Sequence, residues 1–166
     1  MRVLSYAEWK RAISMKNIRG KAVCLFQHRG RVLLTQGFDS VKNEHYLMPI
    51  GGGIEFGERT VDAIRREVRE EIQQEIQHVQ KLQVLENIFS FDGQQGHEIV
   101  FVYAAEFSDR YIYAMQEIMG QESDGSVYHA AWYSAQGLEA LKLPIYPQGI
   151  ESLLLQPLPC GIALNS

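Results

Sequence analysis

The stretch GGGIEFGERTVDAIRREVREEIQQE, residues 51–75, runs from three glycines into a segment rich in arginine and glutamate. Three consecutive glycines predict a flexible loop over residues 51–53. The residues after them predict a helix over 60–74, because Thr60 can serve as its N-cap and Asp62 places a negative charge in the first turn. The stretch therefore predicts a glycine loop that leads into a charged helix.

The predicted helix has one apolar face and one acidic face. The apolar face comprises Val61, Ile64, Val68 and Ile72. The acidic face comprises Glu67, Glu70 and Glu71. These glutamates lie at helical-neighbour positions, so their like charges repel at a cost of roughly 0.2–0.5 kcal/mol per pair. A hard divalent cation would offset that repulsion, because Mg²⁺ prefers oxygen ligands from carboxylates, water and phosphate. The alternative is an ordinary solvated face whose glutamates pair with neighbouring arginines.

The glycines favour a phosphate or metal site over a solvated face. Backbone groups of Gly51, Gly52 and Gly53 can approach a ligand closely, and the helix directs its positive N-terminus toward the same region. Two common phosphate motifs are excluded. The P-loop requires lysine where Glu58 stands, and the dinucleotide fingerprint requires glycine where Phe56 stands. The loop and the helix must therefore be interpreted as one unit.

As one unit, the stretch resembles the Nudix box of the Nudix hydrolases. That box reads glycine, five residues, glutamate, seven residues, then Arg-Glu-aliphatic-x-Glu-Glu-x-Gly-aliphatic. The positions in register are Gly52, Glu58, Arg66, Glu67, Val68, Glu70 and Glu71. Gln73 and Gln74 replace the closing glycine and aliphatic residue, so we expect this helix to run on or to end differently. The resemblance extends over about residues 19–155.

The order of elements predicts an α/β fold, and the resemblance implies a Nudix-type α/β/α sandwich: a mixed β-sheet with helices on both faces. We expect a hairpin of two β runs around a turn at residues 28–30, and a second hairpin of strands 82–91 and 97–107. Further helices are expected at 6–13, 134–141 and 147–155, and a strand at 129–134. The length suits a single domain over residues 1–155. The tail, residues 156–166, is expected to be flexible.

Composition excludes several classes of function. Apolar residues make up 46% of the 166 residues and charged residues 22%, as in a folded globular protein. The net charge of -4 gives no basis for general nucleic-acid binding or for binding an anionic membrane. Cys24 and Cys160 form no CxxC pair, and no run has the length of a membrane span or the form of a signal peptide. We therefore expect a cytoplasmic protein.

The resemblance implies hydrolysis of a nucleoside diphosphate linked to another moiety, by attack of water at phosphorus with Mg²⁺ or Mn²⁺. It implies that Glu70 and Glu71 are metal ligands, that Glu67 is a ligand or the base, and that the carbonyl of Gly51 is a further ligand. Arg66 would orient a glutamate. Glu58 would be a structural partner of that arginine or an outer-shell ligand.

The general base and the substrate pocket are less sharply indicated. Family members place the base variously, so Glu98, Glu117 and Glu122 are candidates outside the helix, and His97 is expected at the surface. Gly52 and Gly53 are candidates for phosphate binding. Base recognition commonly uses aromatic stacking, so the candidate aromatic residues are Tyr46, Phe89, Phe91 and Tyr103.

The sequence leaves the substrate open. Residues 86–91 hold neither the proline that marks ADP-ribose hydrolases nor the tyrosine of dinucleoside polyphosphate hydrolases. A nucleotide sugar, ADP-ribose or a nucleoside triphosphate therefore remains a candidate. The competing hypotheses are a Nudix-fold module that binds a nucleotide without cleaving it, and a merely acidic helical surface. Many relatives are dimers, so a homodimer is among the assemblies that the resemblance allows.

Overall fold

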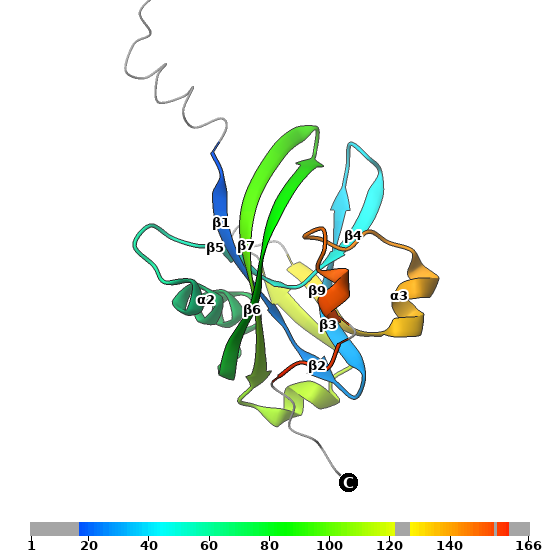
Figure 1. Cartoon of the computed structure of the whole chain (residues 1–166). Coiled ribbons are helices and arrows are strands. Elements are labelled where there is room, and N and C mark those ends of the chain that lie inside the picture. The colour runs from blue at the N-terminus through cyan, green and yellow to red at the C-terminus, as the bar shows by residue number, and fades with distance from the viewer. Residues whose placement is uncertain (1–16, 122–126, 155, 160–166) are drawn as a thin grey trace, which may run out of the picture.

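The computed structural model describes residues 17–121, 127–154 and 156–159, and it shows two β-sheets with helices on either side (Figure 1). The first sheet has the strand order β5-β1-β7-β6. Its strands are β1 (Arg19–Leu25), β5 (Ile50–Gly53), β6 (Ile76–Phe91) and β7 (Gln94–Phe107). Strands β1 and β7 run parallel, whereas β5 and β6 pair antiparallel with their neighbours, so the sheet is mixed as predicted.

The second sheet has the order β2-β3-β9-β8, with β4 paired to β3. Its strands are β2 (Gln27–His28), β3 (Arg31–Asp39), β4 (Glu44–Met48), β8 (Glu117–Gln121) and β9 (Val127–Ser134). The predicted turn between the first two β runs is confirmed by the pairing of β2 with β3. Strand β1 pairs instead with β5 and β7, so the chain passes from one sheet to the other at Phe26.

The helices lie on opposite faces, which confirms the predicted α/β/α sandwich. Helix α2 (Thr60–Ile72) covers one face, while α3 (Ala135–Leu141) and the short α4 (Glu151–Leu154) lie on the other (Figure 1). A 3₁₀ turn, η1 (Arg110–Ala114), follows β7. Alternate residues of β1 enter two different apolar clusters: Ala22 and Cys24 pack with α2, whereas Val23 and Leu25 pack toward α4. Burial on both faces explains why β1 reads as a continuous apolar run.

Two hairpins project side by side from the two sheets (Figure 1). In the β6–β7 hairpin the turn consists of Asp92 and Gly93, both with positive φ, which is the backbone that suits a two-residue turn. The tip of the β3–β4 hairpin contacts this turn. Asp92 Oδ1 accepts hydrogen bonds from the N–H of Ser40 at 3.1 Å and from its hydroxyl at 2.7 Å. We call this pair of contacts the hairpin clasp.

The structure corrects three expectations about residues 51–75. The glycines are not a loop, since Ile50–Gly53 is a strand paired with β1. The N-cap is Arg59 and not Thr60, whose hydroxyl instead meets the Tyr103 hydroxyl. The helix does not run to Gln74. It ends at Ile72, and Gln73 adopts the left-handed conformation with φ 55°.

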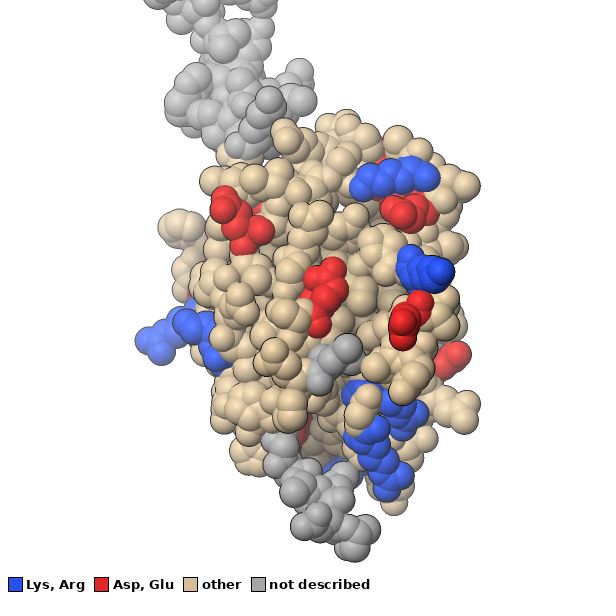
Figure 2. All heavy atoms as spheres, turned by 45° about the vertical axis from the view of Figure 1, so that its right-hand side comes forward, with Lys and Arg blue, Asp and Glu red and all other residues tan. Residues whose placement is uncertain are grey.

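Some expectations fall outside the described residues: the helix at 6–13, Glu122, Cys160, and residues 160–166 of the tail. Just before that last stretch, Gln27 hydrogen-bonds the carbonyl of Gln156 at 2.8 Å and the N–H of Leu158 at 3.3 Å. In the described ranges, no helix combines the length and apolar character that a membrane span requires. Figure 2 shows acidic and basic side chains interspersed on one face, which no single sign of charge covers.

Candidate active site

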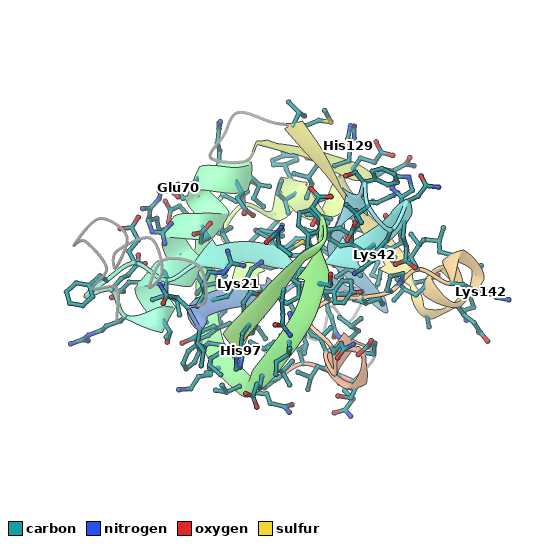
Figure 3. The ribbon with its side chains drawn as sticks, turned by 90° about the horizontal axis from the view of Figure 1, so that it is seen from above. Lys21, Lys42, Glu70, His97, His129 and Lys142 are labelled. Carbon is teal, nitrogen blue, oxygen red and sulfur yellow. The ribbon has the colours of Figure 1, made fainter. Side chains whose placement is uncertain are left out.

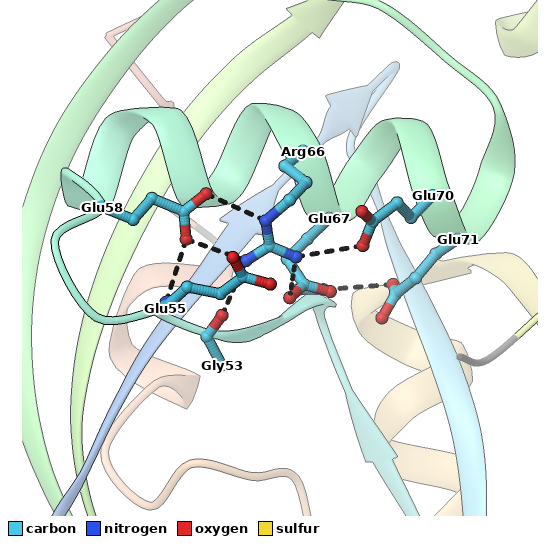
Figure 4. A network of polar contacts seen from close by, with 8 residues as sticks. Gly53, Glu55, Glu58, Arg66, Glu67, Glu70 and Glu71 are labelled. Carbon is cyan, nitrogen blue, oxygen red and sulfur yellow. Dashed lines mark hydrogen bonds and ion pairs between the residues drawn. The ribbon is translucent and has the colours of Figure 1, made fainter. Parts of the chain in front are cut away.

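Arg66 lies at the centre of the polar network in Figure 4, and all five of its N–H donors are in use. Two of the bonds go to the two carboxylate oxygens of Glu58, each at 2.9 Å. One goes to Glu67 at 2.8 Å, one to Glu70 at 3.0 Å, and one to the carbonyl oxygen of Gly53 at 2.9 Å. The arginine thus joins the glycine strand β5 to two glutamates of α2.

This network changes the pKa values of its members in different directions. The hydrogen bonds from Arg66 hold the pKa of Glu58 below its ordinary value. The same bonds, chiefly those to Glu58, raise the pKa of Arg66. Burial raises the pKa of Glu67, and the charges of Arg66 and Lys21 act in the opposite direction. Glu58 is therefore a stable anchor for the arginine, whereas Glu67 is a carboxylate whose charge is only partly compensated.

Two glycines allow β5 to pack closely against its neighbours, Gly51 against β1 and Gly52 against α2. Gly51 has φ 143°, and a Cβ there would lie 2.1 Å from the carbonyl oxygen of Ala22. A Cβ on Gly52 would lie 2.4 Å from the carboxylate carbon of Glu67. The Glu67 carboxylate therefore occupies space that any other residue at position 52 would fill. The glycines of the Nudix-like pattern act here through close packing of a strand.

The donor set fits a hard divalent cation. Glu71 is buried, and its carboxylate accepts a 3.3 Å hydrogen bond from the N–H of Gly51. Together with Glu67 and Glu70 it supplies carboxylate oxygens, the donors that Mg²⁺ and Mn²⁺ prefer. Within the described ranges, no three acidic, histidine or cysteine side chains are already gathered around one point. Arg66 instead binds two of these carboxylates, those of Glu67 and Glu70.

A pocket of ≈ 190 Å³ lies under the hairpin clasp. Its aromatic walls are Tyr46, Phe89, Phe91 and Tyr146. The structure thus brings together three of the four predicted aromatic candidates. The fourth, Tyr103, is not in the pocket, because it is buried beneath α2. Tyr46 contacts both Phe91 and Tyr146 edge to face, with ring centroids 6.0 and 5.8 Å apart.

The candidate bases outside α2 are dispersed. Glu98 is buried at the pocket wall, where its carboxylate accepts a 2.6 Å hydrogen bond from Arg19. Glu117 is exposed on β8 and lies 3.8 Å from His129. His97 is partly exposed and pairs with Glu86 at 2.9 Å, in agreement with the predicted surface histidine. Of these groups only Glu98 lines the pocket.

Comparison with known families identifies this arrangement. The family model described as the NUDIX domain matches residues 16–153, most of the chain. The chain belongs to the Nudix family. It is a Nudix hydrolase, and the activity of that family is hydrolysis of pyrophosphate bonds in small molecules. A search of curated proteins gave no match.

Solved Nudix structures share the fold at low sequence identity. A MutT Nudix hydrolase from Burkholderia pseudomallei is 20% identical with a TM-score of 0.57, covering 84% of this chain and 97% of its own. A Nudix hydrolase from Nitrosomonas europaea is 16% identical with a TM-score of 0.57, covering 82% and 85%. The Bacillus halodurans MutT protein is 18% identical with a TM-score of 0.57, covering 84% and 81%. These similarities establish the common Nudix architecture.

Sequence reasoning missed seven polar or aromatic residues that line the Nudix pocket: Arg19, Lys21, Asp39, Lys42, Glu44, Ser90 and Tyr146. Lys42 pairs with Asp39 at 3.5 Å and also donates to the carbonyl of Ser90, so it fastens the pocket wall. Tyr146 comes from the segment after α3, far along the chain from Tyr46. In the sequence, Lys21 is only a charged residue at the start of an apolar strand. Nothing in its spacing indicates that it lines a pocket.

Proposed function

We propose that this Nudix hydrolase is a metal-dependent pyrophosphohydrolase that cleaves a nucleoside diphosphate linked to another moiety. The observation that carries the proposal is the Arg66 network, which holds Glu67 and Glu70 beside the glycine strand. A pocket with aromatic walls, of a size that admits a planar ring, is lined by Lys21, whose strand partner Gly53 accepts a hydrogen bond from Arg66. One region therefore offers acidic metal ligands and a place for a nucleoside.

In this proposal Glu70 and Glu71 hold Mg²⁺ or Mn²⁺, with Glu67 as a third ligand or as the base and the Gly51 carbonyl as a further ligand. A bound divalent ion neutralises phosphate charge and lowers the pKa of coordinated water. Arg66 orients the glutamates and is itself fixed by Glu58. Burial of Glu67 helps a proton to be taken up there, because burial raises the pKa of that carboxyl.

The pocket would bind the nucleoside end of the substrate. Tyr46 and Phe91 offer ring faces and edges for stacking, as their T-shaped contact leaves both rings in the wall. Gly52 and Gly53 pair with Ala22 and Lys21 of β1, and Gly52 lies against the Glu67 carboxylate, so phosphates would pass beside these two glycines. Glu98 is the pocket carboxylate and remains the candidate base outside α2.

A nucleotide-binding module without catalysis is the second candidate. The intact glutamates argue against it, because Glu67, Glu70 and Glu71 together keep the full set of acidic metal ligands, which a module that only binds does not need. The two candidates differ in one measurable property, which is turnover.

A screen for hydrolysis products decides between them, with ion-exchange chromatography separating each substrate from the mononucleotide and the second phosphorylated product of cleavage. Wild type is incubated with nucleoside triphosphates, nucleotide sugars, ADP-ribose and dinucleoside polyphosphates in Mg²⁺, beside Glu70→Gln, Glu71→Gln and the surface control Glu139→Gln. We expect wild type to turn over at least one class of substrate. Turnover should fall by roughly 100-fold or more in Glu70→Gln and Glu71→Gln and stay unchanged in Glu139→Gln. Absence of turnover on every class supports the binding module. Equal turnover in all four proteins refutes the ligand assignment.

A further inference from the structure

The acidic site lacks an obvious cation to receive the phosphates of its substrate. The chain carries a net charge of -4, and the glutamates of α2 repel a diphosphate until a metal is bound. The arginines of α2 are already engaged. All five donors of Arg66 are used, Arg69 binds Glu75 at 2.6 Å, and Arg65 binds the carbonyl of Ile76 at 2.6 Å. A phosphate-binding group must therefore come from another element.

Three cationic side chains line the pocket, and two of them are paired. Arg19 binds Glu98 at 2.6 Å, and Lys42 binds Asp39 at 3.5 Å. Lys21 makes no hydrogen bond or ion pair with any residue in the described ranges. The remaining pocket carboxylate, Glu44, is exposed to solvent on β4. Among the residues that the structure describes, Lys21 is thus the pocket cation with no partner for its three ammonium donors.

The position of Lys21 connects the pocket to the acidic helix. It lies in β1, the strand between β5 and β7, with Gly53 and Val100 as its neighbours across the two strands. The carbonyl oxygen of Gly53 accepts a hydrogen bond from Arg66, so the strand partner of Lys21 belongs to the Arg66 network. Its charge also acts on Glu67. Figure 3 shows Lys21 between the helix that carries Glu70 and the hairpin turn that carries Lys42.

We propose that Lys21 binds the diphosphate of the substrate and positions it between the nucleoside pocket and the glutamates of α2. The inference rests on the proposed function for the identity of the ligand, and it assigns Lys21 a positioning role. A compact ammonium with free donors suits a phosphate oxygen, whereas the paired Arg19 and Lys42 maintain the pocket walls. A nucleoside without phosphate would not contact Lys21.

Calorimetric titration of the full chain tests this assignment. The probes are ADP, GDP, CDP and UDP, each beside its nucleoside, in Mg²⁺ at low and high salt. The variants are Lys21→Met, Lys21→Arg and the exposed control Lys81→Met. We expect Lys21→Met to weaken diphosphate binding by roughly tenfold or more and to leave nucleoside binding unchanged. Lys21→Arg should retain most of the affinity, and high salt should reduce the difference. Lys81→Met should match wild type.

Several results would overturn the assignment. These are unchanged diphosphate binding in Lys21→Met, an equal loss in Lys21→Arg, an equal loss for nucleosides, or no binding of any diphosphate by wild type. Thermal melts of each variant show whether a loss reflects unfolding, and the arginine variant keeps the test valid if the methionine variant is unstable.

The outcomes also separate this inference from the proposed function. Binding that depends on Lys21 without turnover of any compound refutes the pyrophosphohydrolase and leaves the inference standing. Turnover with the same KM in Lys21→Met refutes the inference and leaves the enzyme standing. If both hold, Lys21→Met raises KM more than it lowers kcat, because the contact is already made with bound substrate.

Discussion

Glu58 binds Arg66 through both carboxylate oxygens, which makes this ion pair the anchor of the site. We predict that Glu58→Gln lowers the free energy of unfolding by about 1–2 kcal/mol near neutral pH, because a bidentate charge-assisted contact is lost. The pKa of Glu58 is lowered in the folded state. Its stabilisation is therefore present above the ordinary carboxyl pKa and is lost as pH falls through the lowered value.

Urea unfolding of wild type and Glu58→Gln between pH 7 and pH 3 measures this effect. The gap between the two proteins should narrow in the acidic part of the range. A gap that is constant with pH would show that the contact acts through packing alone.

Gly52 gives a second prediction for a single residue. A methyl group there would displace the Glu67 carboxylate, which lies 2.4 Å from the added Cβ, whereas a Cβ on Gly53 meets nothing within 4 Å. We expect Gly52→Ala to lower kcat by roughly tenfold or more and to leave the melting temperature nearly unchanged, since only a flexible side chain has to move. Steady-state kinetics tests this, with Gly137→Ala in α3 as the control, where the added Cβ would come no closer than 3.4 Å to the Ser134 hydroxyl. An equal loss in both variants would contradict it.

Helix α2 shows how far the sequence reaches for an element. The apolar spacing of Val61, Ile64, Val68 and Ile72 predicts the helix and its buried face. The structure confirms burial of the last three, whereas Val61 is only half-buried and Ala63, which was not predicted, is buried. The sequence predicts the two ends of this helix less accurately than its buried face. Thr60 is predicted as the N-cap because threonine is a common N-cap residue. In the structure its hydroxyl contacts the Tyr103 hydroxyl instead of capping the helix. That partner comes from a strand distant in sequence, so local pattern could not show it.

The end of α2 yields a prediction about stability. Gln73 holds the left-handed conformation at φ 55°, and its N–H binds the carbonyl of Arg69 at 3.0 Å. The helix therefore stops with glycine-like geometry but without glycine. We expect Gln73→Gly to raise the free energy of unfolding by about 0.5–1 kcal/mol, because glycine adopts this conformation without steric cost.

Chemical denaturation checks this result, with Gln74→Gly as the matched control. Gln74 has no positive φ, so glycine there should be neutral or destabilising. Stabilisation by both substitutions to the same extent would point to an effect on the unfolded chain and not to the helix end.

At the scale of the whole molecule, the two sheets meet through the hairpin clasp above the pocket. We predict that Asp92→Gly loosens both hairpin tips, because it removes the acceptor of the two Ser40 bonds yet keeps a turn residue that suits φ 47°. Amide exchange should accelerate in residues 39–43 and 90–95, and KM should rise by roughly two- to tenfold. Asp92→Asn retains an acceptor and should show smaller changes. Unaltered amide exchange in Asp92→Gly would mean that the hairpin clasp does not hold the hairpin tips in place.

The pocket marks the limit of prediction from this sequence. Glu67, Glu70 and Glu71 lie on one helix, so their grouping follows from spacing alone. The pocket instead gathers side chains from β1, β4, β6, β7 and the segment after α3. Tyr46 and Phe91 were predicted as aromatic candidates from their types, but Tyr103 has the same type and is buried elsewhere. Only the pairing of distant strands distinguishes them.

Arg66 also bears on how this chain acquires its native state. With five bonds to Glu58, Glu67, Glu70 and Gly53, the guanidinium acts as a built-in counterion for the acidic helix. Many metal sites assemble only when the ion arrives, so that folding and loading are one event. In this chain the carboxylates of Glu67 and Glu70 are already paired with Arg66. In the proposed enzyme, folding would therefore not depend on metal supply, and a bound metal would replace Arg66 as the cation beside Glu67 and Glu70.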